Sequence, residues 1–150
     1  MAEEKKKLKT RRDSRECAMK YFFERLVNES YNNLTYELLK ESLQDDALIY
    51  FERLVSDVNE KFDFLKNAVS NFSVKYDSNR IYKIDLSILM IATNEILFYE
   101  DLPNKVAINE AIEIAKIYST DNSPSFINGI LGSVIKDLDK LRGEYEGNVN

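Results

Sequence analysis

Residues 83–99 read KIDLSILMIATNEILFY and form the most apolar stretch of the 150-residue chain. A helix that is apolar on most of its faces is a buried helix, so this stretch is predicted to be a core helix. Asp85, Ser87 and the triplet 93–95 interrupt the apolar run. Because a membrane crossing needs about 20 apolar residues, the stretch is too short and too polar to span a bilayer.

The segments on both sides of this stretch also carry apolar residues at helical spacing. The spacing predicts helices over residues 13–29, 35–43, 45–70 and 105–118 and from Ser123 to Gly143. Asp13 or Ser14 is expected to cap the first helix, and Ser123-Pro124 is a strong start signal for the last one. The residues on the apolar stripes form the predicted core: Ala18, Tyr21, Phe22, Leu26, Leu48, Phe51, Leu54, Val55, Val58, Phe62, Leu65, Val69, Ile108, Ala111, Ile112, Ala115, Tyr118, Ile127, Ile130, Leu131, Val134, Leu138 and Leu141.

The chain has only four glycines and two prolines and no strand pattern of useful length, which favours an all-α fold of six or seven helices. The polar run over residues 76–80 is the best internal boundary. It divides an N-terminal helical half, residues 11–76, from a C-terminal helical half, residues 77–143, within one compact domain. Residues 1–10 are expected to form a basic flexible arm, and residues 144–150 a flexible tail.

The composition argues against an enzyme. The chain has no histidine, which excludes His-based acid–base and nucleophile chemistry and His-containing zinc sites. Its one cysteine, Cys17, cannot form an intrachain disulfide and fits a reducing cytosol. No glycine-rich phosphate loop is present, and no pair of carboxylates stands out by its spacing. We therefore predict no catalytic activity, no cofactor and no metal, and, without a signal-peptide pattern, a cytoplasmic location.

The distribution of charge points to a polyanion as a partner. Residues 1–15 carry seven basic and three acidic side chains, a net charge of +4, so residues 16–150 carry −9. Six of the eight residues in 5–12 are basic. Taken alone, such a run fits a solvated terminus as well as a nucleic-acid contact.

The first predicted helix also offers an aromatic residue beside its core stripe. Phe23 lies on one line of that helix with Arg12, Glu16 and Met19. An aromatic ring near a basic side chain can stack on a base while the cation meets a phosphate. Packing of Phe23 against a neighbouring helix explains the pattern equally well.

The last predicted helix carries a second aromatic residue of this kind. Phe126 lies in its first turn, beside Asn122 and Ser123, where free backbone N–H groups can receive a phosphate. Stacking and simple packing are again equally good explanations. Together with the basic arm, the two aromatic residues make single-stranded RNA the candidate ligand, because its splayed bases suit aromatic stacking.

Three blocks of the sequence carry a family resemblance: residues 11–18, RRDSRECA, residues 106–116, VAINEAIEIAK, and residues 126–131, FINGIL. The first block resembles the opening R-R-x-x-R-E-x-A of the NusB-type family of transcription antitermination factors. Residues 106–116, VAINEAIEIAK, are similar to its V-A-I-N-E-A-I-E-L-A-K block, and residues 126–131, FINGIL, to its F-V-N-G-V-L block. The order and spacing of the blocks agree as well, and the resemblance covers roughly residues 10–138.

The resemblance implies an all-α fold of two three-helix-type bundles packed roughly perpendicular. It implies a protein that is not an enzyme but pairs with NusE, a protein of the small ribosomal subunit. The pair is expected to bind the boxA element of nascent RNA. The resulting complex is expected to join RNA polymerase with other Nus factors and to promote antitermination, notably in ribosomal RNA operons.

The resemblance also assigns roles to individual residues. The residues it places along the RNA are Arg11, Arg12, Arg15, Phe23, Asn122, Ser123 and Phe126. It places Asp85 on a helical patch, around residues 80–93, that faces NusE; Met90 in this patch stands where relatives commonly have Arg, which weakens a charge contact there. Arg15 lies near the core stripe, so a structural ion pair stays open for it. Glu110 is a family hallmark that helix packing explains better than ligand contact.

Two alternatives to this function stay open. The chain can be a purely protein-binding helical adaptor whose basic arm touches nothing specific. It can also be compared with the NusB-like domain of some RNA cytosine methyltransferases, but a chain that ends at Asn150 without a catalytic half favours the stand-alone factor. The sequence leaves open whether the free protein is a monomer or a homodimer.

Overall fold

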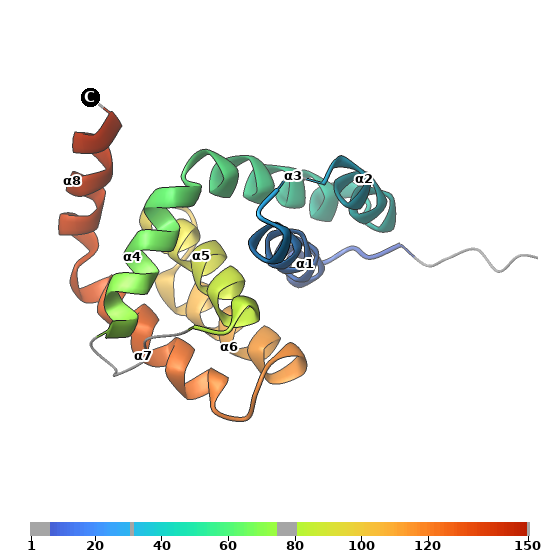
Figure 1. Ribbon diagram of the computed structural model, residues 1–150. Coiled ribbons are helices and arrows are strands. Elements are labelled where there is room, and N and C mark those ends of the chain that lie inside the picture. Colours follow the sequence, from blue (N-terminus) through green and yellow to red (C-terminus); the bar gives the residue numbers. More distant parts are fainter. Residues whose placement is uncertain (1–6, 31, 75–80, 150) are drawn as a thin grey trace, which may run out of the picture.

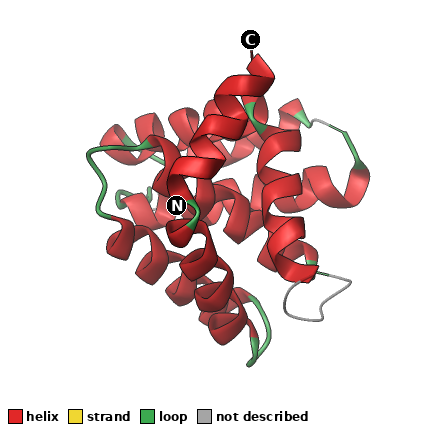
Figure 2. Ribbon diagram, turned by 90° about the vertical axis from the view of Figure 1, so that its left-hand side faces the viewer, coloured by secondary structure: helices red, strands yellow, loops and turns green. Residues whose placement is uncertain are grey.

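The computed structural model describes residues 7–30, 32–74 and 81–149, which form helices joined by short connections (Figure 1). The view in Figure 2 shows helices throughout this part of the chain and no strand. The helices are α1 (Arg11–Asn28), α2 (Asn33–Ser42), α3 (Asp45–Glu60), α4 (Phe62–Val74), α5 (Lys83–Phe98), α6 (Asn104–Tyr118), α7 (Ser123–Lys136) and α8 (Leu138–Val149). The all-α prediction is confirmed, although these residues form eight helices where six or seven were expected.

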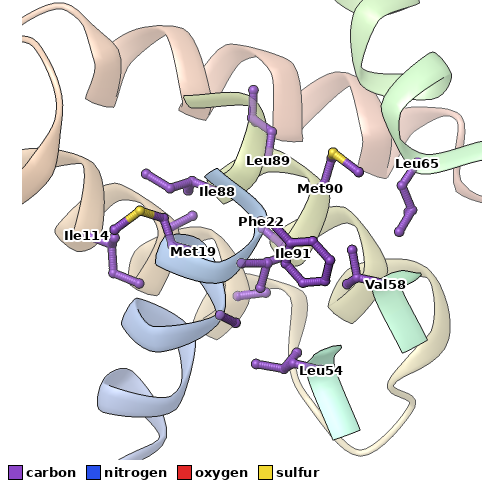
Figure 3. Close-up of a cluster of buried hydrophobic side chains, with 14 of the residues drawn as sticks. Met19, Phe22, Leu54, Val58, Leu65, Ile88, Leu89, Met90, Ile91 and Ile114 are labelled. Atoms are coloured by element: carbon purple, nitrogen blue, oxygen red, sulfur yellow. The ribbon is translucent and has the colours of Figure 1, made fainter. Parts of the chain in front are cut away.

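Helix α5 lies at the centre of the molecule, and all its residues from Asp85 to Leu97 are buried. It packs against α1, α3 and α4, which precede it in the chain, and against α6, α7 and α8, which follow it. In Figure 3 its side chains meet residues of four other helices, namely Met19, Phe22, Leu54, Val58, Leu65 and Ile114. The predicted core helix is confirmed, because a helix that is apolar on most faces must be covered on most faces.

Every residue of the predicted apolar stripes is buried or packs against the core. The predicted helix over residues 45–70 is nevertheless two helices, because the chain departs from helical geometry at Lys61, with φ −107° and ψ 20°. The apolar spacing did not reveal this break, since Val58 before it and Leu65 after it both face the core. Periodicity reports which side is buried and is insensitive to a change of direction between two turns.

The end of the chain differs from the prediction in a similar way. The predicted last helix divides at Asp137 into α7 and α8, and α8 continues through Gly143 to Val149. The prediction that Gly143 ends the helix is therefore wrong. The Tyr145 ring explains the extra turns, because its centroid lies 5.2 Å from that of Phe64 and 5.1 Å from that of Phe98. Aromatic contacts at these distances hold the end of α8 against α4 and α5.

The described end of the basic arm is fixed to the body of the protein. The Leu8 N–H donates to the Ser42 carbonyl at 2.9 Å, and the Gln44 N–H donates to the Leu8 carbonyl at 3.1 Å. This isolated pairing ties the arm to the connection between α2 and α3. The expected flexibility of the arm thus does not apply at Leu8, whereas residues 1–6 lie outside the described residues. The predicted boundary within 76–80 also lies outside them.

Helix α1 starts earlier than predicted. Its N-cap is Thr10, whose hydroxyl accepts the Asp13 N–H while the Asp13 carboxylate accepts the Thr10 N–H. This reciprocal capping box places Arg11 and Arg12 inside the first turn. Ser14, the other predicted cap, is instead buried and donates its hydroxyl to the Ala47 carbonyl at 2.6 Å. Among the described helices, none is long and apolar enough to cross a membrane.

Candidate nucleic-acid interface

The first turn of α1 presents two exposed arginines that are held by acidic residues of two other helices. The Arg11 Nε lies 3.1 Å from the Asp46 Oδ2 of α3. The Arg12 guanidinium forms a two-pronged pair with the Glu110 carboxylate of α6, at 2.7 Å and 3.0 Å. These hydrogen bonds raise the pKa of both arginines. Two fully charged, oriented guanidiniums therefore lie at the start of α1.

Arg15, one turn further along α1, is only 4% exposed. Its guanidinium pairs with the buried Glu95 carboxylate of α5 at 2.8 Å and donates to the Tyr50 hydroxyl at 3.3 Å. The Tyr50 hydroxyl in turn donates to Glu95, and burial together with this carboxylate raises the Tyr50 pKa. The structure thus favours the structural ion pair that the sequence left open for Arg15, and it does not bring this residue to the surface.

Beyond the Arg12–Glu110 pair, side chains of α1 and α6 also meet near the end of α6, at Tyr118. We call the surface around these contacts the α1–α6 face, and its residues are Arg12, Glu16, Lys20, Phe23, Glu110 and Tyr118. The Tyr118 hydroxyl donates to Glu16 at 3.4 Å, and the Lys20 ammonium lies 5.5 Å from the centre of the Tyr118 ring. Phe23, one turn beyond Lys20, is 36% exposed. A base could therefore reach the Phe23 ring beside a basic side chain.

The predicted line of residues on α1 is only partly at the surface. Met19 is buried and contacts the core beside Ile88 and Ile114 (Figure 3). Arg12, Glu16 and Phe23 are the members of that line that belong to the α1–α6 face. Lys20 and Tyr118 were missed by the sequence analysis. Lys20 could have been found from helical spacing, because it follows Glu16 by four residues and precedes Phe23 by three.

The turn from α6 to α7 is organised by a buried carboxylate. Asp85 of α5 accepts the Ser119 hydroxyl at 2.5 Å and the Ser123 hydroxyl at 2.8 Å. The Ser123 Oγ also accepts the Thr120 N–H at 3.3 Å. Ser123 is buried, so it shapes the turn and is not itself presented to a ligand. Asn122, next to it, is exposed.

A cavity of about 180 Å³ opens beside this turn. The residues that line it come from the start of α5, the α6–α7 turn and the start of α7, and they are Ile81, Tyr82, Asp85, Thr120, Asn122, Ser123 and Phe126. Phe126 is half-buried and packs against the core with part of its ring. Whole small-molecule sites usually measure 300 Å³ or more, so this cavity suits one planar group of a larger ligand.

Most of the described part of the predicted partner patch, residues 81–93, is buried. Asp85 is 2% exposed and Met90 is fully buried, because α5 is covered by helices on most sides. The apolar pattern of residues 83–99 had already predicted this burial and conflicts with a partner surface there. Among the described residues of the patch, 81–93, only the start reaches solvent, where Tyr82 is 65% exposed.

Solved structures of other proteins share this all-α fold. A structure of T. maritima NusB superposes with a TM-score of 0.73 over 93% of this chain and 94% of that one, at 32% identity. A crystal structure of the antitermination factors NusB and NusE in complex with dsRNA shares the fold at 15% identity, with a TM-score of 0.73 over 84% of this chain and 96% of that one.

The sequence comparisons identify the family. A family model described as the NusB family matches residues 12–136. The transcription antitermination protein NusB of Clostridium novyi (strain NT) is 44% identical over 130 residues, which cover 84% of this chain and 98% of that protein. The protein of the same name from Finegoldia magna is 41% identical, over 85% of this chain and 94% of that one. The chain belongs to the NusB family, which confirms the resemblance.

Proposed function

We propose that this chain is an RNA-binding transcription antitermination factor that works with NusE on boxA-type RNA. Its relatives are named transcription antitermination proteins, and a NusB bound to NusE and dsRNA has the same fold. In this role it joins RNA polymerase with other Nus factors in the cytoplasm and acts by binding, without catalysis. The observation that carries the proposal is the pair of exposed, oriented arginines in the first turn of α1.

The chemistry of the α1–α6 face and of the neighbouring Arg11 suits a nucleic-acid strand. Arginine and lysine neutralise phosphates and fix the position of the strand, whereas aromatic rings stack on bases. Arg11 and Arg12 supply the first kind of contact, and Phe23 supplies an exposed ring further along α1. Asn122 and the cavity beside Phe126 extend the proposed contact to the α6–α7 turn. Arg15 and Ser123 support this surface from inside.

A partner protein solves the electrostatic difficulty of binding RNA with an acidic body. Residues 16–150 carry a net charge of −9, which repels a phosphate chain at long range. A basic ribosomal protein such as NusE adds positive charge and a second wall beside the strand. We propose that NusE contacts the exposed start of α5, around Tyr82 and Lys83, because the rest of the predicted patch is buried.

A titration of RNA by fluorescence anisotropy tests this function. A boxA-type RNA is titrated with the protein, with and without NusE, at several salt concentrations. We expect binding that is tighter with NusE and weakens as salt rises, because phosphate contacts release counterions. The absence of salt-dependent binding in both cases would overturn the proposal. A scrambled RNA that binds equally well would favour the purely protein-binding adaptor.

A further inference from the structure

The two exposed arginines of α1 are held in the same geometry by unrelated parts of the chain. In Arg11 the Nε and Nη2 atoms face the two oxygens of Asp46, at 3.1 Å and 3.5 Å. In Arg12 the Nε and Nη2 atoms face the two oxygens of Glu110, at 2.7 Å and 3.0 Å. Each carboxylate therefore occupies the side edge of a guanidinium, which is one of its two paired-donor edges.

The other edge of each guanidinium is available. A guanidinium has five N–H donors in a rigid plane, and the side edge uses only the Nε and one N–H of Nη2. Within the described ranges, the Nη1 atoms of Arg11 and Arg12 have no acidic partner. A phosphate can thus pair with the end edge, through Nη1 and Nη2, while the carboxylate stays in place.

The two carboxylate–arginine pairs are also supported from behind by one buried cluster. The Arg11 guanidinium lies 4.5 Å from the centre of the Tyr50 ring, and the Tyr50 hydroxyl donates to Glu95. Glu110, which holds Arg12, also lies 3.8 Å from the Nη1 of Arg15, whose partner is again Glu95. The buried Arg15–Glu95–Tyr50 cluster therefore limits the movement of both surface pairs.

We propose that Asp46 and Glu110 are positioning residues for RNA binding, each presenting the free edge of one α1 arginine to a backbone phosphate. This inference rests on the proposed function and adds two residues, one of which, Glu110, the sequence analysis explained by helix packing. A free arginine loses much side-chain entropy when a phosphate fixes it. Asp46 and Glu110 have already removed that freedom, so the phosphate meets a preorganised donor pair.

The competing possibility is that Glu110 weakens RNA binding instead of strengthening it. Glu110 carries a negative charge at the site where a phosphate would bind, so it can also weaken RNA binding by repulsion or by competition for Arg12. A matched pair of variants separates the two effects. Glu110→Ala and Glu113→Ala each remove one carboxylate from α6, and both carboxylates act on the Arg12 charge. Only Glu110 bonds to Arg12, whereas Glu113 pairs with Lys116 at 2.9 Å.

In the RNA titration with NusE we expect Glu113→Ala to bind with unchanged or slightly higher affinity than the wild type. Glu110→Ala should bind about two- to tenfold more weakly, the cost of ordering one long side chain at an interface. Equal affinities for the two variants, or tighter binding by Glu110→Ala than by Glu113→Ala, would overturn the inference. If the wild type itself shows no salt-dependent binding, the proposed function fails instead.

A double-mutant cycle with Arg12→Ala adds a measurement that general destabilisation would not change. In the wild-type background Arg12→Ala should lower the affinity and reduce the salt slope by about one phosphate contact. In the Glu110→Ala background the same change should cost less affinity than in the wild type, because an Arg12 side chain that Glu110 does not orient makes a weaker phosphate contact. Full additivity of the two substitutions would contradict the inference.

The role proposed for Asp46 of α3 can be tested independently of Glu110, which matters if Glu110→Ala fails to fold. Asp46→Asn should weaken RNA binding, and Asp45→Asn is its control because Asp45 precedes it in the same helix. Asparagine also tolerates the left-handed backbone of Asp45, where φ is 53°. Circular dichroism confirms that each variant is folded. Equal RNA affinities of these two variants would count against the inference.

Discussion

The start of α1 and the α6–α7 turn were both predicted to contact RNA, but their acidic residues lie in opposite environments. At the start of α1 the cations are outside and are held by partly exposed carboxylates, Asp46 and Glu110. At the turn the carboxylate of Asp85 is buried and holds two hydroxyls that shape the backbone. The exposed carboxylates thus orient the two arginines proposed to bind RNA, whereas the buried Asp85 carboxylate orients the turn between two helices.

The largest expected effect comes from breaking the cluster that supports the α1 site. Arg15→Ala leaves the Glu95 carboxylate buried without its cation, so the free energy of unfolding should fall by about 3–5 kcal/mol. Arg11→Ala is the control and should cost less than about 1 kcal/mol, because its ion pair is exposed to solvent. Urea denaturation measures both changes. Equal costs would show that the buried cluster is not the support of this site.

The second largest loss of stability is expected at the α6–α7 turn. Asp85→Ala removes the buried carboxylate that accepts from both the Ser119 and the Ser123 hydroxyl and should lower the free energy of unfolding by about 2–3 kcal/mol. Asp121→Ala removes an exposed carboxylate from the same turn and should be nearly neutral. Denaturation curves of the two variants test this difference. RNA affinity should also fall for Asp85→Ala. An unchanged affinity would show that the α6–α7 turn is not part of the RNA contact.

Phe23 of α1 and Phe126 of α7 allow the two regions to be compared by their contributions to RNA affinity. Phe23→Ala should reduce RNA affinity by about 1–3 kcal/mol, the usual contribution of one base–aromatic stack, with little loss of stability because the ring is exposed. Phe126→Ala should lower both affinity and stability, since that ring also packs against the core. Anisotropy titrations and thermal unfolding provide the two measurements. Wild-type affinity for Phe23→Ala would remove this residue from the proposed contact.

The smallest effect is expected at Asn122, an exposed residue of the α6–α7 turn. Asn122→Asp adds a negative charge to the exposed part of the turn and should weaken RNA binding about two- to fivefold. Because charge repulsion is screened by salt, the difference from the wild type should shrink at high ionic strength. Anisotropy at two salt concentrations measures it, and unchanged affinity at low salt would count against RNA contact at the turn.

The sequence alone predicted the helices and the core because both depend on local periodicity. The breaks at Lys61 and Asp137 escaped this reasoning, since the apolar residues on both sides of each break still face the core. The candidate site was predicted less completely. Arg15 and Ser123 have types and positions that suit a ligand contact, and only the tertiary structure shows that both are buried.

The partners of the exposed arginines could not be found from sequence for a similar reason. Asp46 lies 35 residues from Arg11, and Glu110 lies 98 residues from Arg12. Helical spacing relates residues within a few turns, so it carries no information on such pairs. In contrast, the burial of Met90 was implied by the apolar stretch itself and could have prevented its assignment to a partner surface.

The central position of α5 has a consequence for folding. By sequence α5 belongs to the second half of the chain, yet it covers the apolar faces of α1, α3 and α4 in the first half. A fragment that ends near residue 74 would expose those faces to water and lose the Glu95 partner of Arg15. Neither half therefore has a complete hydrophobic core without the other, and we expect the two to unfold as one cooperative unit.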